Sequence, residues 1–179
     1  MNNHRVIHNG FSLPELMVVV AIVGILSGIS IASFDRNYKQ EVLKRDSREA
    51  STWLREVKSK AVQQNRICEV TIDRSLGTAT QTNPSDSGLA AADRCEQLGD
   101  YSFRAPISTL ISDNQCLWDD NTNKLLISFT ARGTLPCGGE IRLTDTKYST
   151  TRCVKLVSPL GVIREGPEQQ GICNYANSY

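Results

Sequence analysis

Histidine is nearly absent from this sequence, and its absence excludes whole classes of active site. The 179 residues contain two histidines, His4 and His8, and none after residue 8. Ser-His-Asp triads and Cys-His nucleophile pairs therefore have no base in the rest of the chain. Metal sites with histidine ligands are excluded there on the same ground. Since no Ser or Asp has a visible base partner either, we expect no enzymatic activity, no cofactor and no metal site.

A large excess of charge of either sign is also lacking. Twenty Lys and Arg residues stand against nineteen Asp and Glu residues, which gives a formal net charge of +1. A chain this balanced is not a bulk polycation, so a nucleic-acid function would require a local basic patch. The length allows one medium domain, or a small domain with an appendage.

Closely spaced cysteine pairs are missing, although cysteine itself is abundant. All six cysteines follow residue 67, and none forms a C-x-x-C pair, so a zinc site is not expected. An even number confined to one region is typical of disulfides formed in an oxidising compartment, and it leaves all fifteen pairings open. The disulfide candidates are Cys68, Cys95, Cys116, Cys137, Cys153 and Cys173, the last of which we expect to tie down a polar tail.

Long uncharged runs are confined to residues 16–34, which read LMVVVAIVGILSGISIASF. At the rise of an α-helix these residues span about 28 Å, close to the roughly 30 Å hydrocarbon core of a bilayer. A secretory signal peptide is the competing interpretation, but its apolar core is about 7–15 residues long and its cleavage site follows the core. Here the small-residue site Asn9-Gly10 precedes the run. Glu15 is the only charge among residues 11–34, where an unpaired charge is costly and usually functional.

The stretch NG-FSLPELMVVVAIVGILSGI resembles the N-terminal signal of type IV pilins and pseudopilins. The resemblance implies that a prepilin peptidase cuts after Gly10 and methylates the new N-terminal residue, Phe11. It further implies that Glu15 acts in assembly. Pairing of Glu15 with the Phe11 amine of a neighbouring subunit would neutralise both charges and set the register of the two helices. An ordinary membrane anchor with a chance Gly and Glu is the alternative.

The residues after the run predict that the helix continues beyond the membrane. No Pro or Gly interrupts residues 29–65, and one helix is expected over residues 12–64. Its second half carries one apolar stripe, which we expect to pack on an antiparallel β-sheet of the same chain. A coiled coil is the alternative, but the stripe lasts under three heptads. The stripe consists of Leu43, Ala50, Leu54, Val57 and Ala61.

The remainder is typical of short β-strands, so the expected fold class is α+β. Strands are expected at 66–73, on both sides of Pro106, at 124–133, at 140–144, and in a closing hairpin made of 152–158 and 162–164. The strand over 124–133 is expected to pair with that over 140–144. Residues 82–100 are typical of a long loop, and the tail from Glu165 shows no apolar pattern.

Two short motifs extend the resemblance over most of the chain. An F-x-x-x-G turn from Phe129 to Gly133 and a V-S-x-x-G-x-x-R element from Val157 to Arg164 are similar to those of the GspH/FimT group of minor pilins and pseudopilins. The expected organisation has four parts: a leader (1–10), a transmembrane and assembly helix (11–34), an amphipathic helix (35–64), and an extracytoplasmic β-rich domain with disulfides (65–179).

Charge is segregated along the chain although its sum is small. Residues 36–66 carry a net +5, residues 67–141 a net −5 and residues 142–164 a net +4. The ordinary interpretation of this charge segregation is a solvated protein surface. The functional alternative is DNA capture, because clustered cations bind phosphates without sequence preference. Some FimT-like minor pilins bind DNA through a Gly-Arg-x-Arg element, and here Gly161 and Arg164 match but Val162 replaces the first Arg. The candidate DNA-binding residues are Arg142, Lys147, Arg152, Lys155 and Arg164.

The sequence thus predicts a minor pilin or pseudopilin, a structural subunit that helps to initiate or cap a type IV pilus or a type II secretion pseudopilus. The partners implied by the resemblance are other pilins, the prepilin peptidase and, before assembly, the bacterial inner membrane. Arg5 in the short leader indicates that residues 1–10 stay cytoplasmic and that the chain beyond residue 35 lies outside. The alternative is a DNA-binding minor pilin acting in DNA uptake for natural transformation.

Overall fold

The structure is a computed structural model of the whole chain. It describes residues 12–81, 95, 98–112, 118–119 and 123–176, without the side chains of residues 28–33, 112 and 118–119. The chain divides into two units, Met1–Tyr38 and Lys39–Tyr179, and each is described by itself.

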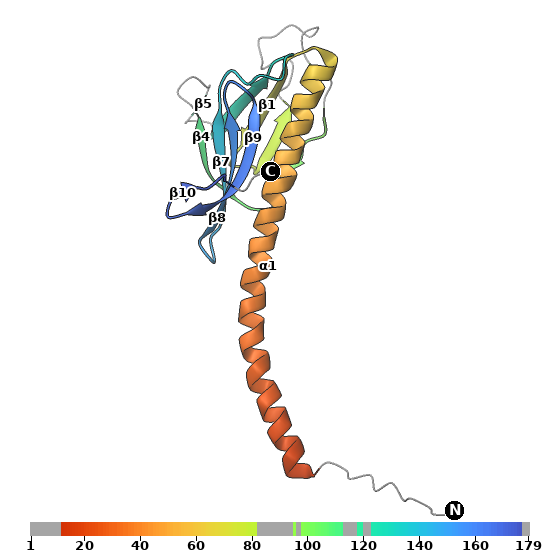
Figure 1. Cartoon of the computed structure of the whole chain (residues 1–179), viewed down its shortest axis with the longest axis vertical. Coiled ribbons are helices and arrows are strands. Elements are labelled where there is room, and N and C mark those ends of the chain that lie inside the picture. Colours follow the sequence, from red (N-terminus) through yellow and green to blue (C-terminus); the bar gives the residue numbers. More distant parts are fainter. Residues whose placement is uncertain (1–11, 82–94, 96–97, 113–117, 120–122, 177–179) are drawn as a thin grey trace, which may run out of the picture. The chain divides into compact units, whose positions relative to one another are not determined.

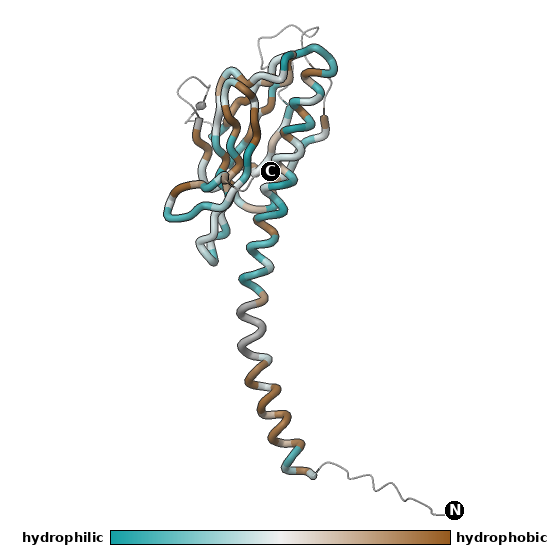
Figure 2. Tube along the Cα trace, in the orientation of Figure 1, coloured by the Kyte–Doolittle hydropathy of each residue, from teal (hydrophilic) through white to brown (hydrophobic). Residues whose placement is uncertain are grey.

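One continuous helix, α1 (Leu13–Gln64), agrees with the helix expected over residues 12–64 (Figure 1). In the first unit its described side chains are exposed except that of Asp35, which is partly buried. Figure 2 shows the hydrophobic colour along the N-terminal part of the helix. Within the described residues, no stretch of helix is both long and apolar enough to cross a membrane. Residues 28–33 of the expected apolar run lie outside the described side chains, and the transmembrane role stays a prediction.

In the second unit, α1 packs on the sheets through the expected apolar stripe. The five stripe residues are at most 2 % exposed. Four of them, all except Ala50, share one hydrophobic core with strand residues such as Val70, Phe129 and Ile141. This confirms an α+β fold in which the amphipathic half of the helix packs on antiparallel β-structure of its own chain.

In the described part of the chain, ten strands form two five-stranded sheets, and all pairs of neighbouring strands are antiparallel. The first sheet has the order β3-β2-β1-β6-β5 and the second has the order β10-β9-β8-β7-β4. The strands of the first sheet are β1 (Cys68–Asp73), β2 (Thr78–Gln81), β3 (Tyr101–Ser102), β5 (Trp118–Asp119) and β6 (Lys124–Phe129). Those of the second sheet are β4 (Ile107–Ser112), β7 (Gly139–Asp145), β8 (Thr150–Val157), β9 (Val162–Gln169) and β10 (Ile172–Cys173).

The pairing expected between residues 124–133 and 140–144 is wrong. These segments form β6 and β7, which lie in different sheets: β6 pairs with β1 and β5, whereas β7 pairs with β4 and β8. The connection over residues 130–138 is longer than a tight hairpin loop, and it carries the chain from one sheet to the other.

The tail beyond Glu165 also differs from the expectation. It continues β9 to Gln169 and returns as β10, which pairs with β9. The apolar alternation that marks a half-buried strand is absent here because backbone pairing and a disulfide from Cys153 to Cys173 hold this hairpin instead. The long loop expected over 82–100 lies largely outside the described residues.

The two glycine motifs meet in space near the C-terminal end of α1. Gly133 and Gly161 have φ values of 71° and 60°, in the left-handed region that favours glycine. A Cβ atom on Gly161 would lie 2.6 Å from the carbonyl oxygen of Gly133. The Nζ of Lys58 donates to the carbonyl oxygens of Leu160 at 3.3 Å and Gly161 at 2.9 Å. Close backbone packing at the two glycines therefore joins the two turns to each other, and the hydrogen bonds of Lys58 join the second turn to the helix.

Candidate functional site

The first candidate site is the N-terminal end of the helix. Gly10 and Phe11 lie outside the described residues. Glu15 lies in the first turn of α1, where a carboxylate is favoured by the partial positive charge of the helix terminus. Its side chain is exposed, and it is surrounded along the chain by exposed apolar side chains. The geometry leaves the carboxylate accessible to a cation from another molecule.

The exposed apolar surface of this segment is extensive. Ten large hydrophobic side chains between Leu13 and Leu26 are each more than half exposed. Isolated exposed hydrophobic residues are ordinary on protein surfaces, but a contiguous apolar surface indicates contact with another protein or with lipid. The segment is therefore suited to burial against something outside the chain.

Arg142 is one of three candidate DNA-binding residues on the outer face of the second sheet. Its Nε donates to Oε1 of Glu140 at 2.7 Å, and its Nη1 donates to Oε1 of Glu168 at 3.2 Å. The hydrogen bond to Glu140 raises the pKa of the guanidinium above its usual range. Because Glu140 and Glu168 both form ion pairs with this guanidinium and neutralise its charge, its attraction for phosphate is weak.

Of the five candidate DNA-binding residues, Lys155 and Arg164 are the two that strand pairing places directly opposite each other. They face each other across β8 and β9, and Arg164 is exposed. The Nζ of Lys155 lies 5.7 Å from the ring centroid of Tyr175, a cation–π arrangement. Lys147 lies elsewhere, in the turn between β7 and β8, where its backbone N–H donates to Oδ1 of Asp145 at 2.9 Å.

Arg152 lies on the opposite face of β8 from Lys155. The strand pairs regularly with β7, so residues three apart point to opposite sides and Arg152 shares a side with the buried Val154. Its side chain is directed toward α1, where burial lowers the pKa of the guanidinium; Glu165 opposes that shift and Arg48 adds to it. The five candidate DNA-binding residues are thus distributed over three places.

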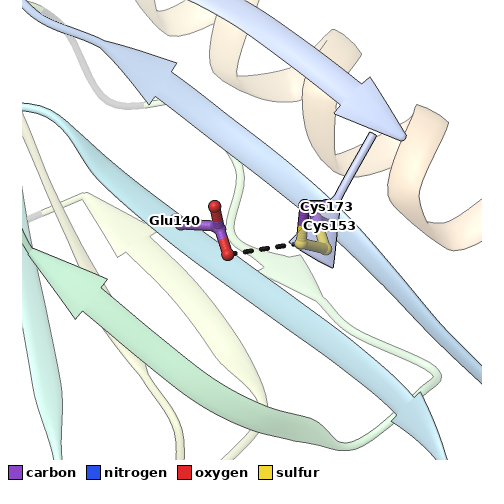
Figure 3. Close-up of side chains that lie close together, drawn as sticks. All are labelled: Glu140, Cys153 and Cys173. Atoms are coloured by element: carbon purple, nitrogen blue, oxygen red, sulfur yellow. Dashed lines mark hydrogen bonds between the residues drawn. A yellow bond between two sulfur atoms is a disulfide. The ribbon is translucent and has the colours of Figure 1, made fainter. Parts of the chain in front are cut away.

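A carboxylate and two cysteines come together beneath the tail, as shown in Figure 3. Cys153 and Cys173 form a disulfide, so neither offers a thiolate to a metal ion. Glu140 Oε1 lies 3.3 Å from Sγ of Cys173, and the hydroxyl of Tyr175 donates to Glu140 Oε2 at 2.7 Å. Burial, followed by this hydrogen bond, raises the pKa of the Tyr175 phenol. The cluster therefore acts as a clamp that holds the tail on the second sheet.

The structure pairs the remaining described cysteines as well. Cys68 is bonded to Cys95, Cys137 is disulfide-bonded, and no described cysteine is free. Cys116 lies outside the described residues. The prediction of paired cysteines left the connectivity open, and only the fold selects these pairs.

A second cationic site was missed by sequence reasoning. Lys44 and Arg48 of α1 line a pocket together with Arg152 of β8 and Glu165 of β9. The spacing of Lys44 and Arg48, one helical turn apart, is visible in the sequence and places both on one face. Their proximity to Arg152 depends on how the helix packs on the second sheet, which no local pattern reveals.

Three comparisons with known proteins bear on this chain, and one of them matches its N-terminal segment. Residues 7–31 match the prokaryotic N-terminal methylation motif. A crystal structure of the type IV minor pilin FimU of Pseudomonas aeruginosa (strain PAO1) is similar, with 18% sequence identity and a TM-score of 0.48, covering 78% of this chain and 96% of that chain. A second crystal form of FimU has 19% identity and a TM-score of 0.45, covering 76% and 98%. No curated protein matches the chain. The chain therefore carries the prokaryotic N-terminal methylation motif at the start of a long helix whose second half packs on antiparallel sheets.

Proposed function

We propose that the chain is a minor pilin or pseudopilin, a structural subunit that helps to initiate or cap a type IV pilus or a type II secretion pseudopilus. The observation that carries this proposal is the methylation motif at residues 7–31 directly on a helix whose apolar side chains are exposed. The likeness to FimU, named as a type IV minor pilin, is consistent with it.

The energetics of the exposed helix support an assembly role. A large hydrophobic side chain gains about 1.5–3 kcal/mol when it passes from full exposure to full burial. The ten between Leu13 and Leu26 are 51–77 % exposed, so their complete burial offers about 9–18 kcal/mol in total. This gain is available in a bilayer before assembly and against the helices of other subunits afterwards. Transfer of the helix from the bilayer to the fibre changes this hydrophobic free energy little, since both environments are apolar.

Processing and pairing follow from the same segment. Cleavage after Gly10 by the prepilin peptidase would leave a methylated Phe11 amine at the helix terminus. In an apolar bundle, Glu15 cannot stay ionised and unpaired, and the Phe11 amine of a neighbouring subunit supplies the opposite charge. Pairing then selects one axial register between adjacent helices.

Intact-mass analysis of the chain purified from its native host tests the processing. The expected mass corresponds to a chain that begins at methylated Phe11. Retention of residues 1–10 while the peptidase is active contradicts the proposal.

Substitution of Glu15 tests the pairing. We expect Glu15→Ala and Glu15→Gln to insert into the membrane normally but to be depleted from sheared fibres, because both lack the charge. Glu15→Asp keeps the charge and is the matched control, for which partial incorporation is expected. Normal incorporation of Glu15→Ala would rule out the pairing.

DNA capture is a second candidate function, favoured by the adjacent cations Lys155 and Arg164. Two neighbouring cations release few counterions, so binding should be no tighter than about 10⁻⁴–10⁻⁶ M at physiological salt. It should weaken as salt is added, with a slope of log K against log salt no steeper than about −2. A mobility-shift titration at two salt concentrations, with Lys155→Ala and Arg164→Ala beside the parent, measures this. Tight, salt-resistant binding that Arg164→Ala abolishes would make DNA capture the better proposal.

A further inference from the structure

A pocket of about 270 Å³ lies between α1 and the β8–β9 hairpin, and neither Glu15 nor the pair Lys155 and Arg164 lines it. Two of its cations, Lys44 and Arg48, come from the helix, and a third, Arg152, comes from β8. Glu165 of β9 is the carboxylate in the lining. The formal charge of these four side chains is +2, and Glu41, which pairs with Lys44 and also attracts Arg152, reduces it to +1. The pocket is therefore electropositive by one charge.

Most of the charged groups around the pocket have partners. The Nζ of Lys44 lies 3.3 Å from Oε1 of Glu41 on the exposed side of the helix. The Nε of Arg48 lies 3.7 Å from Oε1 of Glu165, whose other carboxylate oxygen lies 3.4 Å from the hydroxyl of Ser47. Glu165 is therefore occupied by Arg48 and Ser47 and balances one of the three cations.

Arg152 differs from the other two cations. Among the described residues its guanidinium has no hydrogen bond and no salt bridge. The group is partly buried, and a guanidinium remains charged and has five N–H donors that need acceptors. Removing these donors from water without supplying acceptors is costly. An oxyanion in the pocket would supply the missing acceptors and neutralise the excess charge.

We propose that this pocket binds a single small oxyanion, a carboxylate or a phosphate group, with Arg152 as its main hydrogen-bond donor and Lys44 and Arg48 supplying charge. The planar fork of an arginine accepts either group in two parallel N–H···O bonds. The proposal is independent of the assembly role, because it concerns only residues of the second unit.

An extended nucleic-acid backbone is a poorer occupant of this pocket. Glu165 in the lining repels a second phosphate, and the cations surround one volume rather than following a row. The outward-facing pair Lys155 and Arg164 lies on the opposite side of the sheet from Arg152. Binding of DNA and binding of a small anion should therefore respond to different substitutions.

Thermal unfolding of the full chain in detergent tests the proposal with inorganic phosphate and with acetate as probes. Sodium chloride at matched ionic strength is the reference, since it screens surface charge equally. We expect a saturable rise in the melting temperature with at least one probe beyond that in chloride. A rise with phosphate alone identifies phosphate-bearing ligands, and an equal rise with acetate identifies carboxylates such as acidic side chains.

Two pocket variants and one control decide whether the pocket is responsible. Arg152→Gln should weaken the effective probe at least tenfold, and Arg48→Gln, at a more exposed position, should weaken it at least threefold if Arg152→Gln does not fold. Arg164→Gln removes an equal charge outside the pocket and should stay within twofold of the parent. No rise beyond chloride, or equal weakening by Arg164→Gln, overturns the proposal. Binding of a short oligonucleotide without any effect of phosphate or acetate also overturns it, in favour of the outer face.

Discussion

Asp46 offers the sharpest test of how the helix is attached to the domain. It lies in α1, is 1 % exposed, and its carboxylate reaches β3 and the segment that follows this strand. Oδ1 accepts a hydrogen bond of 2.5 Å from the hydroxyl of Tyr101. Oδ2 accepts from the backbone N–H groups of Arg104 at 3.0 Å and Ala105 at 2.8 Å. One helical side chain thus satisfies three donors of a segment far away in the sequence.

The expected cost of Asp46→Ala follows from these three contacts. A hydrogen bond to a charged group contributes about 1.5–3 kcal/mol, and a buried donor left without a partner costs about 1–3 kcal/mol. The three bonds form one network and do not add independently. Since removing the carboxylate also relieves its own desolvation, we expect a loss of about 3–4 kcal/mol in the free energy of unfolding. Tyr101→Phe removes one bond and should cost about 1–2 kcal/mol.

Urea unfolding of the full chain in detergent, followed by tryptophan fluorescence, measures these losses. Trp53 is a suitable probe because its ring lies 6.1 Å from that of Tyr101 and its Nε1 donates to the carbonyl oxygen of Gly99 at 2.9 Å. Asp145→Ala is the matched control, since that carboxylate also accepts two backbone N–H groups but within one turn. A loss below about 1 kcal/mol for Asp46→Ala, or one no larger than for Asp145→Ala, would refute the reasoning.

Three further perturbations test the second unit. Gly161→Ala should lower the free energy of unfolding by about 1–3 kcal/mol, because the φ of Gly161 is 60° and the added Cβ would lie 2.6 Å from a backbone carbonyl oxygen. A melting temperature equal to that of the parent would contradict this prediction. Burial, then hydrogen bonding to a carboxylate, raises the pKa of both Tyr101 and Tyr175, so above pH about 10 the unfolded phenols lose protons that the folded ones keep. The stabilising contribution of each phenol is therefore fully present below that pH, and above it the free energy of unfolding falls by at most about 1.4 kcal/mol per pH unit for each phenol. Urea titrations at pH about 8 and 10.5 measure this, and coinciding curves would refute the raised pKa values. Replacing Cys153 and Cys173 together by Ser should cost about 2–4 kcal/mol and speed proteolysis of the tail; equal protease resistance would show that the clamp is not needed.

Sequence reasoning succeeded where the signal is local and periodic. The stripe containing Leu54 and Val57 repeats with the period of a helix, and these residues are buried as expected. The hairpin of β8 and β9 was visible because two apolar strands flank a tight turn at Gly161. In both cases the residues that interact are neighbours on one element or across one turn, so the period alone identifies them.

It failed where partners are distant in the chain. The carboxylate of Asp46 bonds groups more than fifty residues away, and the segments around Phe129 and Ile141 were assigned to one sheet when they lie in two. Strand pairing across sheets depends on the total packing of the core rather than on any single pattern. The tail hairpin was missed because backbone pairing and a disulfide, not apolar alternation, hold it.

By itself the sequence determined the methylation motif, the apolar segment that follows it, the long helix and the α+β class. Each of these depends on residue types at fixed short spacings, which backbone geometry converts directly into one face or one length. Only the tertiary structure decided which cysteines pair, which basic residues are neutralised, and that Lys44, Arg48 and Arg152 surround one pocket. Those outcomes require elements far apart in the chain to pack side by side, and that packing is set by the burial of the whole core at once.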